Sequence, residues 1–279
     1  METVVNPEEE QWKLAKELYE EDKLFQAARI VRYLRHIPLE EENVNDSIVT
    51  ANSTLRKSIL RIQKESEECE NFLSLLLNEQ EWECLSKQSD RCKVYYNSKQ
   101  GPDVHGFKIE TEIDAPFLNT AALINEVDLL QDLFWYVGSS KEIAKLSRCK
   151  KILRARFVTP WPFTTREAIL YGYAVDGLDE DHSVVVCFRS ATAQDFEDYN
   201  FDPVPLDSKD TVRLDVKIGG IQFIPLERRK TLFRTAVFAD PQLSYIPKWL
   251  FHWVTKQHKE SPNIGKNKKA CLTVLRNPF

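Results

Sequence analysis

The residues that most often carry out chemistry, histidine and cysteine, are spread along the chain without a recognisable grouping. No two cysteines form a Cys-x-x-Cys pair, and no histidine stands at the spacing of zinc ligands. The sequence contains no Gly-x-Ser-x-Gly elbow, phosphate-binding loop or dinucleotide fingerprint. It therefore predicts a protein that is not an enzyme and that uses no metal and no other cofactor.

Two arginines lie within a run at residues 149–159 whose alternation is typical of a strand. In a strand, Arg154 and Arg156 project to one face and the apolar residues between them project to the other. A buried guanidinium needs a carboxylate or an anion of a ligand as its partner. The two arginines could therefore bind a ligand on the inner side of a sheet. The alternative, which we favour, is that both face solvent, because arginine is rarely buried without a partner.

The composition excludes several classes of protein. The 279 residues are 42% apolar and include 15 Phe, which is enough for a hydrophobic core. No apolar run approaches the ~20 residues that span a bilayer, which excludes an integral membrane protein. The acidic N-terminus resembles neither a secretory signal nor a mitochondrial presequence, so we expect a cytoplasmic protein.

Charge is distributed unevenly along the chain. Residues 1–80 hold 10 Lys and Arg against 17 Asp and Glu, whereas residues 226–279 hold 11 against 3. The basic segment predicts transient contact with an anionic membrane or an acidic partner, and no contact with nucleic acid. A solvated basic face is the alternative. The predicted contacts are Lys248, Lys256, Lys259, Lys266, Lys268 and Lys269.

The first 80 residues have the pattern of helices. Residues 7–80 contain no glycine, and apolar residues recur at helical spacing over 12–34 and again over about 47–77. Pro38 and the glutamates after it separate the two runs. We predict an antiparallel helical hairpin, residues 1–80, followed by a second domain of residues 81–279.

From Trp82 onward the pattern changes to the alternation of β-strands. A curved antiparallel sheet needs a helix on its concave side, and an amphipathic helix is predicted from Pro247. The predicted fold class is therefore α+β, with a helix-grip arrangement and a bulge or bend at Gly219-Gly220. The expected strands are 92–98, 107–114, 149–159, 166–176, 182–191, 211–218, 221–225 and 231–239, with helix at 116–147.

Three ordered motifs resemble those of START (steroidogenic acute regulatory protein-related lipid transfer) domains. Residues 159–167 are similar to the Pro-Trp-Pro…Arg-Asp stretch, with Glu167 in place of the Asp. Residues 219–226 are similar to the family's Gly-Gly followed by a Pro-Leu strand end. Residues 239–250 resemble the Asp-Pro…Pro-x-Trp-Leu entry to the closing helix, although Gln242-Leu243-Ser244 stands where the family usually has a Gly. The resemblance covers about residues 82–260.

This resemblance implies that the chain binds one lipid or sterol-like molecule in an apolar tunnel between the sheet and the closing helix, and that it can transfer this molecule. The alternative is a non-catalytic adaptor subunit that uses residues 1–80 to dock to a protein partner. Trp161, between two prolines, is expected to be a fixed plug where the chain turns. The expected ligand-binding residues, some of them from strand parity, are Arg154, Arg156, Tyr171, Tyr173, Phe188, Phe233, Leu250, Trp253 and Val254.

Overall fold

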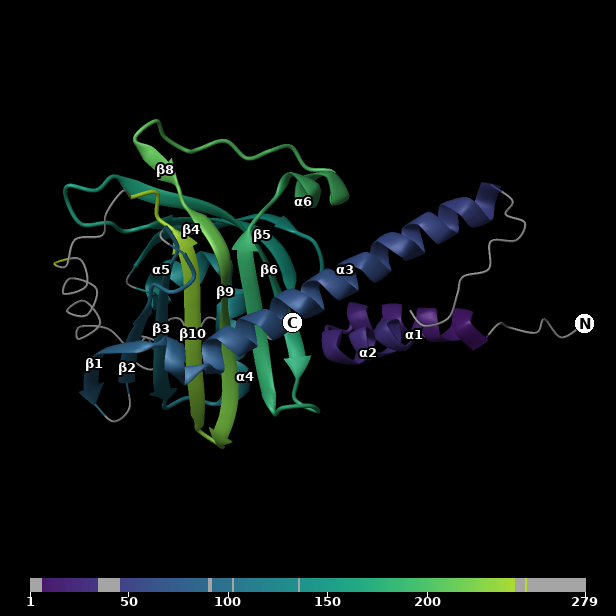
Figure 1. Cartoon of the computed structure of the whole chain (residues 1–279), viewed down its shortest axis with the longest axis horizontal. Coiled ribbons are helices and arrows are strands. Elements are labelled where there is room, and N and C mark those ends of the chain that lie inside the picture. The colour runs from purple at the N-terminus through teal and green to yellow at the C-terminus, as the bar shows by residue number, and fades with distance from the viewer. Residues whose placement is uncertain are drawn as a thin grey trace, which may run out of the picture.

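Ten strands form a single sheet in a computed structural model of the chain, which describes residues 7–34, 46–89, 92–101, 103–134, 136–243 and 249 (Figure 1). The order across the sheet is β1-β2-β3-β10-β9-β7-β6-β5-β4, and neighbours in this order are antiparallel. β8 pairs in parallel with the start of β6. The strands are β1 (Glu83–Ser89), β2 (Cys92–Asn97), β3 (His105–Ile113), β4 (Val137–Lys145), β5 (Lys150–Phe157), β6 (Thr165–Gly177), β7 (Ser183–Ser190), β8 (Thr211–Arg213), β9 (Asp215–Glu227) and β10 (Lys230–Asp240).

Among the described residues, three α-helices and a short 3₁₀ turn precede the sheet: α1 (Pro7–Glu20), α2 (Leu24–Leu34), α3 (Asp46–Leu77) and η1 (Glu79–Glu81). The single helix predicted over 12–34 is broken at Asp22, whose φ is 65°. The main-chain carbonyl of Asp22 accepts a hydrogen bond from the N–H of Asp176, and its carboxylate lies 2.7 Å from the guanidinium of Arg148. Contacts with the sheet therefore accompany the end of α1, where the sequence pattern alone would continue the helix.

The sheet has two different faces because side chains alternate along each strand. On β6, Tyr171 and Tyr173 belong to a hydrophobic cluster that includes Phe72 of α3. Ala168 and Leu170 point the other way, into a separate cluster. We call the first side of the sheet the α3 face and the second side the inner face.

Helix α3 crosses the front of the sheet in Figure 1 and contacts β7, β9 and β10. Its ring at Phe72 is fully buried over Gly220, where an added Cβ would lie 2.7 Å from the ring and 2.6 Å from the carbonyl oxygen of Val186. An added Cβ at Gly219 would instead lie 2.5 Å from the ring of Phe188, on the inner face. The glycine pair therefore lets an aromatic ring approach the strand from each side. β9 continues through this glycine pair as one strand, and its register with β10 shifts just before the pair, between Val216 and Ile218.

Replacing Gly220 with alanine is expected to lower the free energy of unfolding by about 1–3 kcal/mol, because neither the Val186 carbonyl nor the buried ring can move freely away. The control is Gly172→Ala on β6, where an added Cβ meets its nearest neighbour at 3.7 Å. That change should stay within about 0.5 kcal/mol. Urea unfolding measures both, and equal effects would contradict the proposed close approach of α3.

The inner face carries helices from the segment between β3 and β4. α4 (Phe117–Asn125), the short 3₁₀ turn η2 (Val127–Leu129) and α5 (Leu130–Leu133) lie behind the sheet in Figure 1. Leu123 and Leu133 pack with Phe223 and Phe233 of β9 and β10. The helix predicted over 116–147 was wrong beyond residue 133. β4 is polar and lacks clean alternation, so its pairing with β5 decides its structure.

The α+β class, the antiparallel sheet and the N-terminal helices are confirmed. The closing helix predicted from Pro247 lies outside the described residues, apart from Trp249. The division at residue 80 stays a prediction, although α3 shares one hydrophobic cluster with the sheet. No helix within the described ranges is both long and apolar enough to cross a membrane.

Candidate functional site

A buried carboxylate on α3, Glu65, joins the N-terminal helices to the sheet. Its Oε1 accepts hydrogen bonds from the hydroxyls of Tyr19 (2.8 Å) and Tyr171 (2.5 Å), and its main-chain carbonyl accepts one from Tyr173 (2.9 Å). Its Oε2 lies 2.7 Å from Nζ of Lys150, and both charged side chains are at most 7% exposed. The result is a buried ion pair with hydrogen-bond partners on both carboxylate oxygens, which is the arrangement in which such a pair is tolerated.

The electrostatics of this cluster favour a structural role. Burial lowers the pKa of Lys150, and the carboxylate of Glu65 opposes that shift. Burial, reinforced by the same carboxylate, raises the pKa of Tyr19 and of Tyr171. Both tyrosines therefore remain protonated donors at neutral pH. A general base needs a pKa near the working pH, so these hydroxyls are poorly suited to proton abstraction.

A second set of ion pairs lies beside the first on the α3 face. The guanidinium of Arg189 on β7 lies 2.7 Å from a carboxylate oxygen of Glu68 and 2.6 Å from one of Asp195. Asp195 belongs to α6 (Ala193–Asp198), where it forms a capping box with Thr192. Burial raises the pKa of Asp195, but the hydrogen bonds from Arg189 and Thr192 outweigh it and lower that pKa to about 2.

This low pKa predicts a pH dependence of stability. A carboxylate whose folded-state pKa is depressed stabilises the fold above its ordinary pKa of about 4, and the contribution is lost as pH falls toward 2. Between pH 5 and pH 2, the wild type should lose about 2 kcal/mol more unfolding free energy than Asp195→Asn. Urea unfolding at a series of pH values measures both. Parallel curves would show that Arg189 does not depress the pKa of Asp195.

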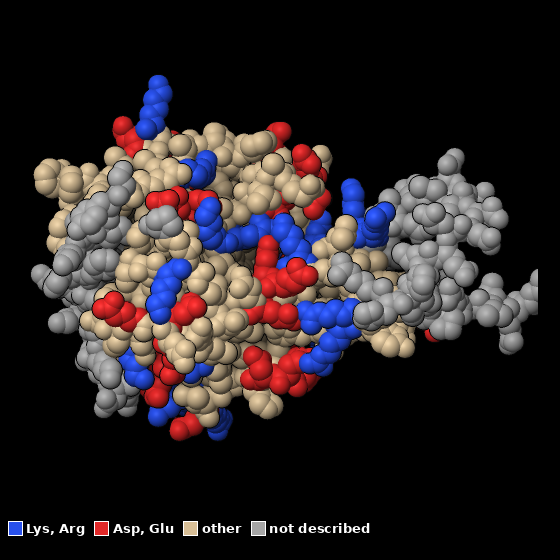
Figure 2. All heavy atoms as spheres, in the orientation of Figure 1, with Lys and Arg blue, Asp and Glu red and all other residues tan. Residues whose placement is uncertain are grey.

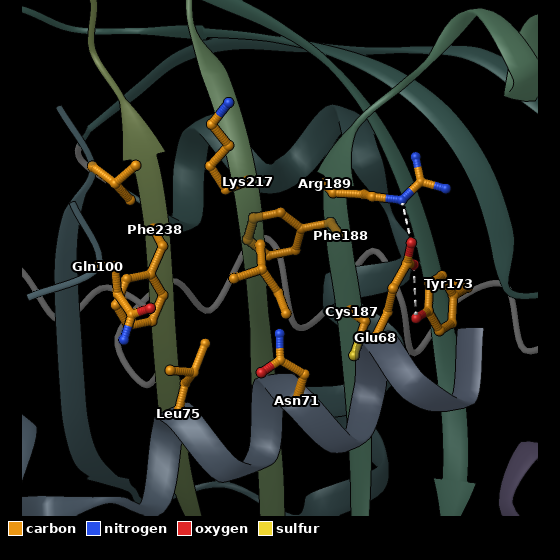
Figure 3. Close-up of a pocket in the computed structure, with 12 residues that line it drawn as sticks. Glu68, Asn71, Leu75, Gln100, Tyr173, Cys187, Phe188, Arg189, Lys217 and Phe238 are labelled. Carbon is orange, nitrogen blue, oxygen red and sulfur yellow. Dashed lines mark hydrogen bonds and ion pairs between the residues drawn. The ribbon is translucent and has the colours of Figure 1, made fainter. Parts of the chain in front are cut away.

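A cavity of about 430 Å³ opens on the α3 face between α3 and strands β7, β9 and β10. Figure 3 shows Leu75 and Asn71 of α3 directed toward it, with Phe238 behind. Its charged lining residues already have partners: Arg189 pairs with Glu68, and Lys217 pairs with Asp215 at 2.5 Å. Figure 2 accordingly shows red and blue side chains side by side over the middle of this face. The cavity therefore presents no uncompensated charge to a ligand.

Two of the predicted ligand-binding residues, Tyr173 and Phe188, line the cavity on the α3 face, but their side chains belong to clusters on opposite faces of the sheet. Phe188 and Phe233 lie on the inner face. Tyr171 and Tyr173 occupy alternate positions on β6 whose side chains point to the α3 face. There both hydroxyls donate hydrogen bonds to Glu65. The other three predicted wall residues lie outside the described residues. These are Leu250, Trp253 and Val254.

The two arginines of β5 also lie on the α3 face. Arg154 and Arg156 lie 3.1 Å and 3.2 Å from the two carboxylate oxygens of Asp207, in the loop that precedes β8. Arg154 also lies 3.8 Å from the fully buried Glu167. Both arginines point away from the inner side, but their side chains are only 20% and 32% exposed and are paired with carboxylates, so the expectation that they face solvent holds only in part.

A buried cation that belongs to the START-like motif at residues 159–167, but was not among the predicted ligand-binding residues, lies on the inner face. Arg166 lies two residues before Ala168 on β6, so its side chain points to the same face as that of Ala168, and it is 6% exposed. Its Nε donates to the carbonyl of Pro241 at 2.8 Å, and its Nη1 donates to the carbonyl (2.7 Å) and hydroxyl (2.9 Å) of Thr164. Burial lowers the pKa of Arg166. The signal that could have revealed it is its strand parity, opposite to that of Glu167.

Trp161 is not the packed plug that we expected. Its side chain is 90% exposed at the loop between β5 and β6. Two residues on, Phe163 stacks on Trp249 with ring centroids 5.7 Å apart. The loop thus holds one aromatic ring in solvent and another against the only described residue of the predicted closing segment. The lysines of the predicted membrane contact, from Lys248 to Lys269, lie outside the described residues.

The fold described above is that of StAR-related lipid transfer domains. Human StAR-related lipid transfer protein 5 matches with a TM-score of 0.58 and 14% identity, over 76% of this chain and 96% of that chain. Human STARD10 matches with a TM-score of 0.52 and 17% identity, over 74% of this chain and 79% of that chain. No protein-family model and no curated protein sequence matches the chain. The START resemblance is thus confirmed at the level of the fold.

Proposed function

We propose that the chain binds one lipid or sterol-like molecule on the inner face of its sheet and does not act on it catalytically. The observation that carries the proposal is the START-like fold together with a largely apolar inner face. Two hydrophobic clusters meet on that face at Phe188 of β7. A buried apolar surface with few polar groups is the usual form of a site for a hydrophobic small molecule.

In this proposal the segment that follows β10 supplies the second wall of the site. Leu250, Trp253 and Val254 remain our candidates there, opposite Phe188 and Phe233. Tyr171 and Tyr173 lie on the α3 face and so are not part of the site proposed here, although Tyr173 lines the cavity on that face. Transfer of the ligand between membranes is a further step that this fold would permit.

The direct test is native mass spectrometry of the purified protein after incubation with mixed lipid vesicles. One lipid per chain is the expected result. Val254→Trp should block uptake because the larger ring fills the proposed site, whereas Val254→Ala should not. A wild-type protein that remains empty would contradict the proposal.

We further propose that Trp161 contacts the lipid surface during exchange. An indole that is almost fully exposed, three residues after Val158, which is itself 45% exposed, is suited to the membrane interface. Trp161→Ala should lower binding to anionic vesicles several-fold, measured by co-sedimentation. It should leave the free energy of unfolding within about 0.5 kcal/mol, since the ring packs on little. Unchanged vesicle binding would remove Trp161 from the contact.

The adaptor function remains the second candidate, and two exposed apolar residues favour it. On α1 and α2, Leu14 and Tyr33 are 47% and 66% exposed. Such residues are ordinary when scattered singly, but on a helical unit added to the sheet they could meet a protein partner. This function would be favoured over lipid binding if the purified protein carries no lipid and binds a protein partner that it no longer binds when Leu14 and Tyr33 are replaced.

A further inference from the structure

The structure describes three buried cations, and one of them is not neutralised. Lys150 pairs with Glu65. Lys108 lies 4.5 Å from the ring centre of Tyr95, and Glu110 and Glu79 are close enough to act on its charge. Arg166 differs from both, because within the described ranges its hydrogen bonds go only to neutral oxygens.

A buried positive charge without a counter-charge is costly. Carbonyl and hydroxyl oxygens satisfy N–H groups, but they leave the net charge of the guanidinium in place. The polar partners of Arg166 use its Nε and Nη1, and no hydrogen bond to Nη2 is found within the described residues. A guanidinium edge of this kind matches the geometry of a phosphate or carboxylate group.

The position of Arg166 relates it to the inner face. It pairs with Phe157 of β5 and with Val212 of β8, and its strand neighbours of like parity, Ala168 and Leu170, belong to an inner-face cluster. Its bond to Pro241 ties it to the chain just after β10. The segment that continues from there, residues 244–279, contains a single acidic residue, Glu260. The chain therefore has little carboxylate of its own to bring to this place.

We propose that Arg166 binds an oxyanion, the phosphate or carboxylate of an anionic amphiphile whose apolar part lies on the inner face. This inference rests on the proposed lipid binding and adds to it the class of ligand. The acyl or ring portion would contact the apolar residues of β6 and β7. The anionic group would lie at the rim, beside Pro241 and the loop that carries Trp161.

The test compares ligands that differ in charge but little in apolar size. Dioleoyl phosphatidic acid is compared with dioleoylglycerol, and oleate with oleyl alcohol, by native mass spectrometry and competitive displacement. The wild type should prefer each anionic member by at least about tenfold, which is the scale of one charged hydrogen bond in a buried site. Inorganic phosphate alone is tested in parallel by its effect on thermal unfolding.

Three variants assign the preference to this side chain. Arg166→Gln should reduce binding of the anionic members to the level of the neutral ones and leave the neutral ones unchanged. Arg166→Lys, which retains the charge, should keep part of the preference even if the glutamine variant folds poorly. Arg229→Gln removes one exposed positive charge from the β9–β10 turn and serves as the matched control.

The outcomes separate this inference from the proposed function. Binding of neutral lipids without preference for the anionic members, or a preference that survives in folded Arg166→Gln, overturns the oxyanion site and leaves lipid binding intact. Failure to bind any lipid and any phosphate overturns both. Stabilisation of the wild type by phosphate alone, lost in Arg166→Gln and without a lipid preference, would support the oxyanion site with a free anion as its occupant.

Discussion

Replacing Glu65 with alanine is expected to lower the free energy of unfolding by about 3–5 kcal/mol, which is the usual effect of breaking a buried ion pair. The substitution leaves the ammonium of Lys150 buried without its counter-charge. It also removes the acceptor of the Tyr19 and Tyr171 hydroxyls. Denaturant unfolding followed by tryptophan fluorescence measures the change.

The control for this prediction is Glu70→Ala on the same helix. Glu70 pairs with Arg32 at 2.6 Å, but both side chains are about half exposed, so the loss should be within about 1 kcal/mol. A double variant, Glu65→Gln with Lys150→Met, removes both charges and keeps an oxygen for the two tyrosines. It should recover much of the loss. Equal losses in Glu65→Ala and Glu70→Ala would contradict the role of the buried pair.

Deleting residues 1–80 is expected to leave a chain that does not fold, whereas deleting residues 1–34 should leave a folded but less stable one. The larger deletion removes α3, which supplies Phe72 to the core and accepts the Nζ–H of Lys108 at the carbonyl of Leu76. It also leaves Tyr171 and Tyr173, which are fully buried, without their cover. Circular dichroism and size-exclusion chromatography measure the outcome.

The same experiment tests the division of the chain into domains. An independent domain of residues 81–279, which the change of periodicity predicts, requires the shorter chain to fold after deletion of residues 1–80. An 81–279 protein that is folded by circular dichroism and monomeric by size-exclusion chromatography would support that boundary. It would also show that the contacts of α3 are dispensable. Failure of the 35–279 chain to fold would instead mean that α1 and α2 are part of the core.

Much of the fold could be predicted from sequence because β-strand alternation and helical spacing are local signals. β5, β6 and β10 fall within a few residues of their expected positions for this reason. β4 could not be predicted, since its polar sequence becomes a strand only through pairing with β5. The break at Asp22 likewise coincides with contacts to Arg148 and Asp176, which are far away in sequence.

The candidate site was harder to predict than the fold. Which face of a strand points inward depends on what covers it, and the sequence does not state that α3 covers one side of β6. Tyr171 and Tyr173 were therefore expected on the ligand side, although their hydroxyls donate hydrogen bonds to Glu65 on the other face. Arg166 had a readable parity, but its importance lies in the absence of a carboxylate among its described partners, which no local pattern encodes.

The position of α3 in the chain has a consequence for how the protein is made. Glu65 leaves the ribosome 106 residues before its partner Tyr171, and the strands β9 and β10 beneath Phe72 follow later still. At a synthesis rate of 5–20 residues per second, the helix waits roughly 5–20 s for that tyrosine alone. During this delay its apolar stripe has no sheet to cover. The nascent chain therefore passes through a stage in which the acidic side chains of the helix, and any chaperone that binds it, must keep it from aggregating.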